Sequence, residues 1–339
     1  MTYLTYDDIQ LVPAFSDIKS RQSIDLTTNL SKNYTISIPI VGSPMDTVCE
    51  SEMAFKLYQL GGVGCIHRFN KIIEQYTEIQ KLCEKISATG KWSTTIPIMA
   101  AIGVQEDDKK RAKNLIKAGA NVLLIDVAHG DHQNVIDMTK WCKDNLPSHV
   151  DIIAGNIATA EAAERLQDAG ADGLRVGIGG GSLCTTRIKT GFGVPNVTCL
   201  EEISKFAKVP IMADGGIRSS GDIAKALAVG ADNVMLGSLL AGTLESPGQM
   251  VEKGNALYKR YRGSASLETK TTHGQAQRNV EGESTIIPFK GGVKYIIKGL
   301  TDGVRSALSY AGAKEIKSFF PKYVQVTNAG QNEAKPHLL

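Results

Sequence analysis

Long apolar runs, paired cysteines and an excess of charge of either sign are all missing from this sequence. No apolar stretch reaches the roughly 18 residues that a membrane-spanning helix needs. The N-terminal residues lack the basic-then-apolar order of a signal peptide. The net charge of +3 is too small to favour nucleic acid or an anionic membrane as a partner. We therefore expect a cytoplasmic protein that binds neither nucleic acid nor a membrane.

The six cysteines form neither a C-x-x-C pair nor a cluster with histidine at metal-ligand spacing. Their scatter excludes the disulfide framework of a short secreted domain, so we expect reduced thiols. Five of them, at positions 49, 65, 83, 142 and 199, fit the usual role of cysteine as a small buried hydrophobe. Cys184 does not, because it lies in the polar, glycine-rich stretch GGGSLCTTRIKTGFGVPN.

From about residue 97 the sequence alternates short apolar strands with amphipathic helices. Three of the helices end in nearly the same phrase (KAGAN, DAGAD or AVGAD), in which glycine supplies the left-handed conformation that ends a helix. Repeated strand–helix units predict a parallel sheet, and their number favours a closed (β/α)8 TIM barrel. We expect a single barrel domain over residues 1–339.

An open, doubly wound Rossmann sheet is the alternative fold. It requires a G-x-G-x-x-G motif at the start of a helix. The stretch GIGGGS (177–182) supplies similar glycines, but the residues after it read as a long loop. The barrel is therefore the preferred interpretation.

Two glycine-bearing loops follow predicted strands late in the chain. Asp214, Gly215 and Gly216 end one strand, and Gly237 and Ser238 end the next. In a barrel, such loops lie on the functional face, where their backbone N–H groups bind phosphate. Because a carboxylate at the same edge suits the two hydroxyls of a ribose, these loops predict a site for a nucleoside monophosphate.

Cys184 is a candidate nucleophile on the same face. Backbone amides and Arg187 would favour its thiolate, and Thr186 offers a hydroxyl to a water or a leaving group. The residues alone thus indicate a nucleotide-binding barrel with a covalent cysteine.

Nine segments in order carry a family resemblance: YDDIQLVP (6–13), SPMDTV (43–48), GGVGCIHRF (61–69), DVAHG (126–130), AGNIAT (154–159), GSLCTTR (181–187), ADGGIRSSGDIAKAL (213–227), MLGSLLAGTLESPG (235–248) and YKRYRG (258–263). Together they resemble the IMP dehydrogenase / GMP reductase family from end to end. The pair of CBS modules that many dehydrogenases carry would fall between about residues 80 and 97, and the sequence there holds no such insert.

The resemblance implies a covalent step in which Cys184 attacks C2 of a purine and a hydride moves between that carbon and a nicotinamide. Expected contacts to the nucleotide come from Ser182, Asp214, Gly215, Gly216, Gly237, Ser238, Tyr261, Arg262, Gly263 and Ser264. Expected contacts to the cofactor come from Asp126, Ala128, Asn156 and Ser266. The backbone carbonyls of Gly177, Gly179 and Cys184 match positions that hold potassium in the dehydrogenases.

The two branches of the family differ in the flap, here about residues 264–285. Dehydrogenases activate water with an Arg-Tyr pair on a long flap, whereas this flap is shorter and its Arg278 is followed by Asn279. Glu281 matches the glutamate that, with Thr186, protonates departing ammonia in the reductases, and an ammonia leaving group needs an acid. The resemblance therefore implies a GMP reductase, with catalytic residues Cys184, Thr186 and Glu281 and with NADPH as cofactor.

Three alternatives stay open: an IMP dehydrogenase with a shortened flap, a reductase of a modified guanine nucleotide, and a purine-nucleotide sensor without turnover. The sequence does not distinguish NADPH from NADH. The tail, about residues 325–339, resembles the dehydrogenase C-terminus, in which Glu333 would complete a potassium site on a neighbouring subunit. With that resemblance we expect a homotetramer.

Overall fold

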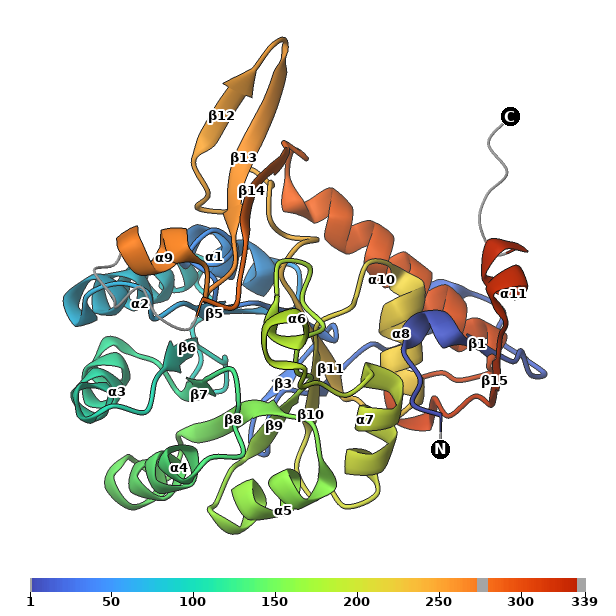
Figure 1. The fold of residues 1–339 in the computed structure, drawn as a ribbon, viewed down its shortest axis with the longest axis horizontal. Helices are drawn as coiled ribbons and strands as arrows, with labels where there is room; N and C mark the ends of the chain where they lie inside the picture. The colour runs from blue at the N-terminus through green and yellow to red at the C-terminus, as the bar shows by residue number, and fades with distance from the viewer. Residues whose placement is uncertain (1, 273–279, 334–339) are drawn as a thin grey trace.

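A computed structural model describes residues 2–272 and 280–333, and its centre is a closed barrel of eight parallel strands (Figure 1). Around the barrel the strands follow the order β10-β11-β4-β5-β6-β7-β8-β9. Their bounds are β4 (Ile40–Gly42), β5 (Val63–Ile66), β6 (Met99–Ile102), β7 (Val122–Asp126), β8 (Asp151–Ile157), β9 (Gly173–Val176), β10 (Ile211–Asp214) and β11 (Asn233–Leu236). The predicted TIM barrel is confirmed.

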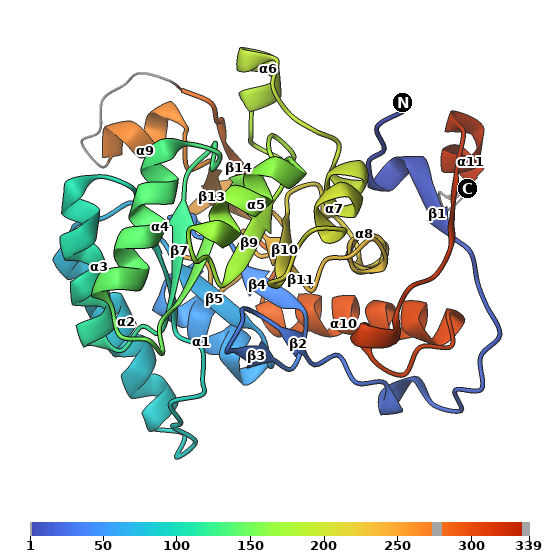
Figure 2. The ribbon, with the colours of Figure 1, turned by 90° about the horizontal axis from the view of Figure 1, so that it is seen from below.

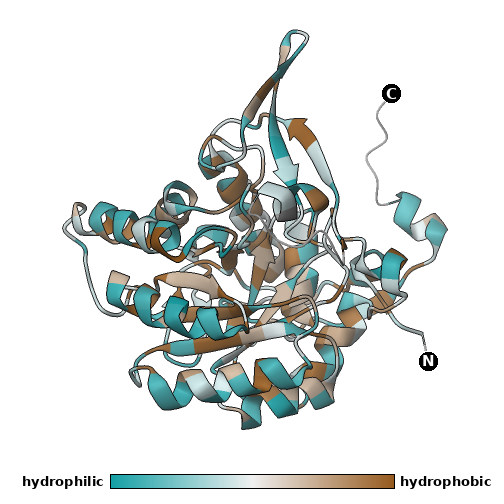
Figure 3. Cartoon of the chain, turned by 60° about the vertical axis from the view of Figure 1, so that its left-hand side comes forward, coloured by the Kyte–Doolittle hydropathy of each residue, from teal (hydrophilic) through white to brown (hydrophobic). Residues whose placement is uncertain are grey.

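The strands are buried along almost their whole length, as expected for a parallel sheet closed on itself. Inside the barrel, side chains such as Val41, Met99, Leu124 and Met235 form a separate apolar cluster. The larger core lies between the strands and the helices around them. Figure 3 shows these apolar strands in brown and the mostly teal outer faces of the helices.

Eight helices cover the outside of the barrel in the described residues: α1 (Ser51–Gln59), α2 (Ile72–Ser87), α3 (Glu106–Ala118), α4 (Gln133–Asn145), α5 (Ala160–Asp168), α7 (Asn196–Ser204), α8 (Ser220–Ala228) and α10 (Val293–Tyr310). The three repeated helix-ending phrases behave as predicted, because Gly119, Gly170 and Gly230 all have positive φ. Between α2 and β6 the chain spans only residues 88–98, without a further helix or strand.

Above the carboxyl ends of the strands stands a three-stranded antiparallel sheet, formed by β12 (Met250–Lys253), β13 (Ala256–Arg262) and β14 (Ser284–Pro288). Figure 1 shows the β12–β13 hairpin projecting from the barrel, with α9 (Leu267–Thr272) beside its base. The short helix α6 (Thr186–Thr190) lies near it, in the loop after β9. A flap was expected in this region from the sequence, whereas the projecting hairpin was not.

The first and last described segments lie together on one side of the barrel, near α8 and α10 (Figure 2). There β1 (Ile9–Leu11) pairs with β15 (Tyr323–Gln325), and α11 (Asn328–Glu333) follows. The remaining short elements are η1 (Tyr6–Asp8), η2 (Arg21–Ser23), β2 (Thr28–Asn29), β3 (Thr35–Ile36) and η3 (Ile316–Ser318). Among the described residues, none of the helices is both long and apolar enough to cross a membrane.

Candidate active site

A cavity of about 410 Å³ opens at the carboxyl ends of the barrel strands. Its wall brings together most of the residues expected from the sequence. These are Ser182, Asp214, Gly215, Gly216, Gly237, Ser238, Tyr261, Gly263, Ser264, Asp126, Ala128, Asn156, Gly177, Gly179, Cys184, Thr186 and Glu281. Residues from the loops after β7, β8, β9, β10 and β11 therefore meet at one place, as barrel topology requires.

Cys184 differs from the other five thiols in its surroundings. It is partly exposed on the cavity wall, whereas Cys49, Cys65, Cys142 and Cys199 are buried. Burial raises the pKa of Cys142 and Cys199 to about 12, and that of the half-buried Cys83 to about 11. These five thiols are therefore held in the unreactive protonated form, in agreement with their expected packing role.

A chain of hydrogen bonds joins Cys184 to the flap. The thiol donates to the Thr186 hydroxyl oxygen (Sγ to Oγ1, 3.2 Å), and that hydroxyl donates to the Glu281 carboxylate (Oγ1 to Oε2, 2.7 Å). Thr186 is buried, and its hydroxyl lies between the thiol and the carboxylate. The arrangement places a nucleophile, a relay hydroxyl and a carboxylate in line.

Glu281 is held in place by backbone pairing rather than by its side chain alone. The Thr185 N–H donates to the Glu281 carbonyl (2.9 Å), and the Glu283 N–H donates to the Leu183 carbonyl (2.9 Å). Cys184 and Gly282 lie opposite each other in this short antiparallel contact. The cysteine loop and the return segment of the flap thus form one hydrogen-bonded unit.

Arg187 closes the cysteine loop at its base. Its guanidinium donates to the Ile178 carbonyl (3.1 and 3.0 Å) and to the Val194 carbonyl (2.8 Å). Gly179 and Gly193 make room for it, because a Cβ at either position would lie 2.5 Å from the Arg187 side chain. One side chain therefore joins the two ends of the loop that carries Cys184.

A buried ion-pair chain also lines the cavity. Arg175 donates to Asp126 (Nη1 to Oδ1, 2.6 Å) and to Asp214 (Nη2 to Oδ2, 3.0 Å). Although burial by itself lowers the Arg175 pKa, the carboxylates of Asp214 and Asp126 outweigh it, and the pKa lies above its ordinary value. Arg68 contacts the second oxygen of Asp126 (3.3 Å), and the Asn156 amide donates to Asp214 Oδ2 (2.7 Å).

This chain links the two halves of the expected site. Asp214 belongs to the predicted ribose side and Asp126 to the predicted nicotinamide side. All the Asp214 side-chain contacts just described are to Oδ2, and none of them is to Oδ1. Arg175 and Arg68 were missed by the sequence analysis. A signal existed for Arg175, since an arginine inside the apolar strand GLRV requires a buried partner.

Tyr261 and Ser182 lie within hydrogen-bond distance on the cavity wall (Oη to Oγ, 3.1 Å). Burial raises the pKa of Tyr261, the bond to Ser182 lowers it, and the charge of Asp214 raises it, with a net upward shift. The phenol therefore stays protonated and keeps a hydrogen to donate. Both residues line the same cavity as the two glycine loops.

Two expected contact residues lie outside the cavity wall. Arg262 turns its guanidinium to the other side of the flap base, where it meets Asp46 (Nε to Oδ2, 2.9 Å). Ser266 is buried, and its hydroxyl contacts Thr269 (2.9 Å). Neither side chain lines the cavity, because Arg262 is paired with Asp46 and Ser266 with Thr269.

Three other expected residues lie away from the cavity or outside the described residues. Glu333 ends α11, outside the barrel beside β15 (Figure 1). Arg278 and Asn279, on which the comparison of flap chemistry rested, fall outside the described residues.

Potassium was expected at the backbone carbonyls of Gly177, Gly179 and Cys184. The Gly177 carbonyl accepts the Asn156 amide (2.7 Å), and the neighbouring carbonyls of Ile178 and Val194 accept the Arg187 guanidinium. Within residues 2–272 and 280–333 there is also no cluster of three or more acidic, histidine or cysteine side chains arranged for a metal.

Comparison with known proteins places the chain among purine nucleotide oxidoreductases. Residues 3–337 match the model of the IMP dehydrogenase / GMP reductase domain. An inosine-5'-monophosphate dehydrogenase from Cryptosporidium parvum is 38% identical, with 98% of this chain and 94% of the relative covered. A GMP reductase from Streptococcus agalactiae (strain NEM316) is also 38% identical, with 96% and 95% covered.

A solved structure has nearly the same fold. It is a cysteine-to-alanine variant of the GMP reductase of Trypanosoma brucei, in complex with guanosine 5'-monophosphate. It superposes with a TM-score of 0.94 and 32% sequence identity, and covers 100% of this chain and 98% of its own.

Proposed function

The chain belongs to the IMP dehydrogenase / GMP reductase family of nicotinamide-dependent oxidoreductases, and we propose that it acts within this family as a GMP reductase. The proposed reaction converts GMP and NADPH, with one proton, to IMP, ammonia and NADP⁺. The observation that carries this proposal is the hydrogen-bonded chain from Cys184 through Thr186 to Glu281.

The order of these three groups suits the expulsion of ammonia. When the Cys184 sulfur bonds to C2 of the purine, its proton passes to the Thr186 hydroxyl as that hydroxyl releases its own proton to Glu281. The C2 amino group then leaves as ammonia after taking up a proton from the same relay. The step needs a group that accepts the thiol proton and returns it to the leaving amine, and the Glu281 carboxylate lies two hydrogen bonds from the thiol.

The second half-reaction restores the thiol. NADPH, when bound, supplies the hydride that replaces sulfur at C2, with cleavage of the C–S bond. Cys184 leaves as a thiolate and takes up the one proton of the overall reaction, which enters from solvent through Thr186. The Glu281 carboxylate is by then back in its starting state, because it gave up its proton to ammonia in the first half-reaction.

The residues on the two walls fit the two ligands. Backbone N–H groups of the loops at Gly215–Gly216 and Gly237–Ser238 suit the phosphate, with Tyr261 and Ser182 adding hydroxyls. Asp126, Ala128 and Asn156 form the wall on the side proposed for the nicotinamide. Arg68 is an unanticipated cation on this side, where it suits an anionic dinucleotide.

We also propose that the protein assembles as a homotetramer in the cytoplasm. Exposed apolar side chains support self-association: Phe15 is 91% exposed, Tyr310 61% and Val324 51%. They lie on segments whose backbones are hydrogen-bonded to each other, Ala14 to Tyr310 and Val12 to Lys322. Mass photometry of the purified protein tests the assembly.

The proposed location in the cytoplasm is supported by the free thiols, which suit a reducing compartment.

The function is tested by two parallel assays, GMP with NADPH and IMP with NAD. We expect loss of NADPH absorbance that requires GMP and yields ammonia and IMP. The Glu281→Gln and Thr186→Val variants should lose about 10²- to 10⁴-fold in kcat, as for removal of a general acid. Glu283→Gln is the matched control, because this exposed carboxylate lies two residues along the same segment.

The contrary results are equally specific. NADH formation from IMP and NAD would mean that the shortened flap activates water, and the chain would be a dehydrogenase. Activity with only a modified guanine nucleotide would change the substrate but keep the relay. Binding of GMP without turnover in both assays would indicate a nucleotide sensor.

A further inference from the structure

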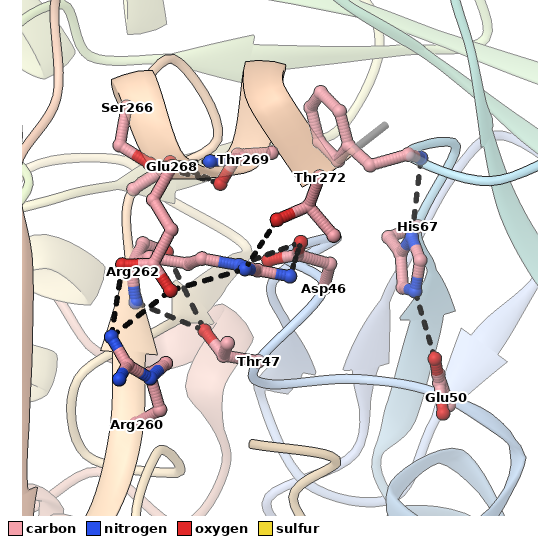
Figure 4. Close-up of polar contacts among 12 residues, drawn as sticks. Asp46, Thr47, Glu50, His67, Arg260, Arg262, Ser266, Glu268, Thr269 and Thr272 are labelled. Carbon is pink, nitrogen blue, oxygen red and sulfur yellow. Dashed lines mark hydrogen bonds and ion pairs between the residues drawn. The ribbon is translucent and has the colours of Figure 1, made fainter. Parts of the chain in front are cut away.

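Arg262 lies at the end of β13 and does not line the nucleotide cavity. Figure 4 shows its guanidinium between Asp46 and Glu268. Together with Asp46 it lines a second, separate cavity of about 400 Å³. Only 14% of the Arg262 side chain and 3% of the Asp46 side chain are exposed. A buried ion pair of this kind holds its two backbone segments in a defined relation, because separating the charges leaves one of them uncompensated.

One half of the Arg262 contacts is to the barrel. Nε and Nη2 donate to Asp46 Oδ2 (2.9 and 2.7 Å), and the Arg262 backbone N–H donates to the Thr47 hydroxyl (3.2 Å). Asp46 and Thr47 belong to the loop between β4 and α1. Ser43 and Met45 of this same loop line the nucleotide cavity. Arg262 is thus anchored to the wall of the active site from behind.

The other half of its contacts is to the flap helix α9. Arg262 Nη1 donates to Glu268 Oε1 (3.3 Å) and to the Thr272 hydroxyl (3.1 Å). Arg260, on the same face of β13, donates to both oxygens of Glu268 (3.1 Å each). Figure 4 shows Glu268 between the two arginines and Asp46 on the far side of Arg262. Of these two arginines, Arg262 is the one whose contacts reach the barrel.

The segment after Arg262 also holds the segment that carries Glu281. Arg262 lies opposite Ser284 in the β13–β14 ladder, and the Gly263 N–H donates to the Glu283 carbonyl (2.9 Å). The Glu281 N–H donates to the Ala265 carbonyl (3.2 Å). A displacement of residues 262–265 therefore moves the backbone of Glu281 with it.

We propose that Arg262 is a positioning residue, which ties the flap to the barrel through Asp46 and Glu268 and thereby holds the Glu281 carboxylate against Thr186. This inference rests on the proposed function, since Glu281 is there the acid of the relay. It differs from the expected nucleotide contact, because Arg262 acts from outside the cavity. The ion pair between Arg262 and Asp46 fixes the position of the Glu281 carboxylate. Loss of this pair should leave the residues that bind the nucleotide in place.

An arginine suits this role and a lysine does not. The planar guanidinium contacts the two carboxylates and a hydroxyl through three nitrogens at once, whereas one ammonium cannot reach them together. Arg262→Lys keeps the charge beside buried Asp46, which favours a folded variant. Arg260→Met is the matched control: it removes an arginine from the same strand and from the same Glu268, but breaks no contact with Asp46.

The first measurement is hydrogen–deuterium exchange of the whole chain without ligands. In Arg262→Lys we expect peptides that contain the Thr185 and Glu283 amides to exchange at least tenfold faster than in the parent, since these amides donate across the flap contact. Arg260→Met should match the parent. Unchanged exchange in Arg262→Lys would overturn the proposal, whatever the substrate of the enzyme proves to be.

The second measurement separates positioning from nucleotide binding. With GMP and NADPH, we expect kcat of Arg262→Lys to fall about tenfold to a hundredfold, the scale of a misplaced catalytic group, with KM for GMP changed less than twofold. Glu281→Gln should cost much less in the Arg262→Lys background than in the parent. Fully additive effects, or a rise in KM that accounts for the whole loss, would contradict the proposal.

The exchange and kinetic measurements test the role of Arg262 and the proposed function separately. If the parent protein does not turn over GMP, the proposed function fails, while the exchange experiment still decides whether Arg262 holds the flap. If the parent turns over GMP but Arg262→Lys behaves like Arg260→Met in both measurements, only the role of Arg262 is refuted.

Discussion

Cys184 lies on the cavity wall beside a hydroxyl, whereas the other thiols are packed among apolar side chains. Burial raises the pKa of the Cys49 and Cys65 thiols far above the ordinary value, and the same cause acts on Cys142 and Cys199. A thiolate is the reactive form, so the same residue type is inert at these four positions. The environment, and not the residue type, distinguishes the nucleophile.

We therefore expect alkylation to be selective at the residue scale. Iodoacetamide at pH 8 should modify Cys184 and leave Cys49, Cys65, Cys142 and Cys199 intact, as read by peptide mass spectrometry. GMP should slow the modification at least tenfold, because it would cover the cavity. Equal labelling of Cys142 or Cys199 in the folded protein would show that these sites open far more than their burial indicates.

The cysteine loop and the flap act as coupled elements. Backbone pairing of residues 183–185 with 281–283 joins them, and Arg187 closes the loop at Ile178 and Val194. A loop of this length between β9 and α7 would otherwise sample many conformations, and ordering it costs conformational entropy. The guanidinium reduces that freedom in the native state before any ligand binds.

At this scale we predict that Arg187, rather than a monovalent cation, supports the loop. Replacement of potassium by sodium should leave kcat of the parent within about twofold, while Arg187→Met should lower kcat at least tenfold, the cost of a misplaced nucleophile. Low, non-denaturing guanidinium should restore part of the loss. Lys189→Met, an exposed position on α6, is the control. A strict potassium requirement in the parent protein would contradict this interpretation.

The whole barrel serves as the frame that brings distant segments to one site. Asp126, Asn156, Arg175 and Asp214 come from four consecutive strands, β7 to β10, and meet because parallel strands end at the same edge. The same close packing buries four thiols, which makes the stability of the fold sensitive to alkali. Buried cysteines that pack well in the core at neutral pH therefore lower the stability of the fold at alkaline pH.

We predict that the free energy of unfolding falls above about pH 9. An unfolded thiol ionises near its ordinary value of 9.0, whereas the folded Cys142 and Cys199 stay protonated to about 12. In that interval the folded state binds more protons, so raising the pH favours unfolding, by at most about 1.4 kcal/mol per thiol and pH unit. Urea unfolding from pH 7 to 10.5 measures the slope, and Cys142→Ala should reduce it. A slope that Cys142→Ala leaves unchanged would assign the effect elsewhere.

Much of this protein was determined by its local sequence. The barrel follows from strand and helix periodicity, and the helix ends at Gly119, Gly170 and Gly230 follow from a conformational preference of glycine. Cys184 was distinguishable because the composition around it is unlike a core. Such features depend on residues close together in the chain, so they can be read before the fold is known.

Other features were decided only by the tertiary structure. The direction of Arg262 depends on Asp46, more than two hundred residues earlier, and the bridge made by Arg175 depends on carboxylates of two other strands. Motif matching placed Arg262 and Ser266 at the ligand, but the packing of the flap base turned both away from the cavity. A side chain takes its partners from whatever the fold brings beside it, and charge pairing across the barrel is not encoded in the spacing of neighbouring residues.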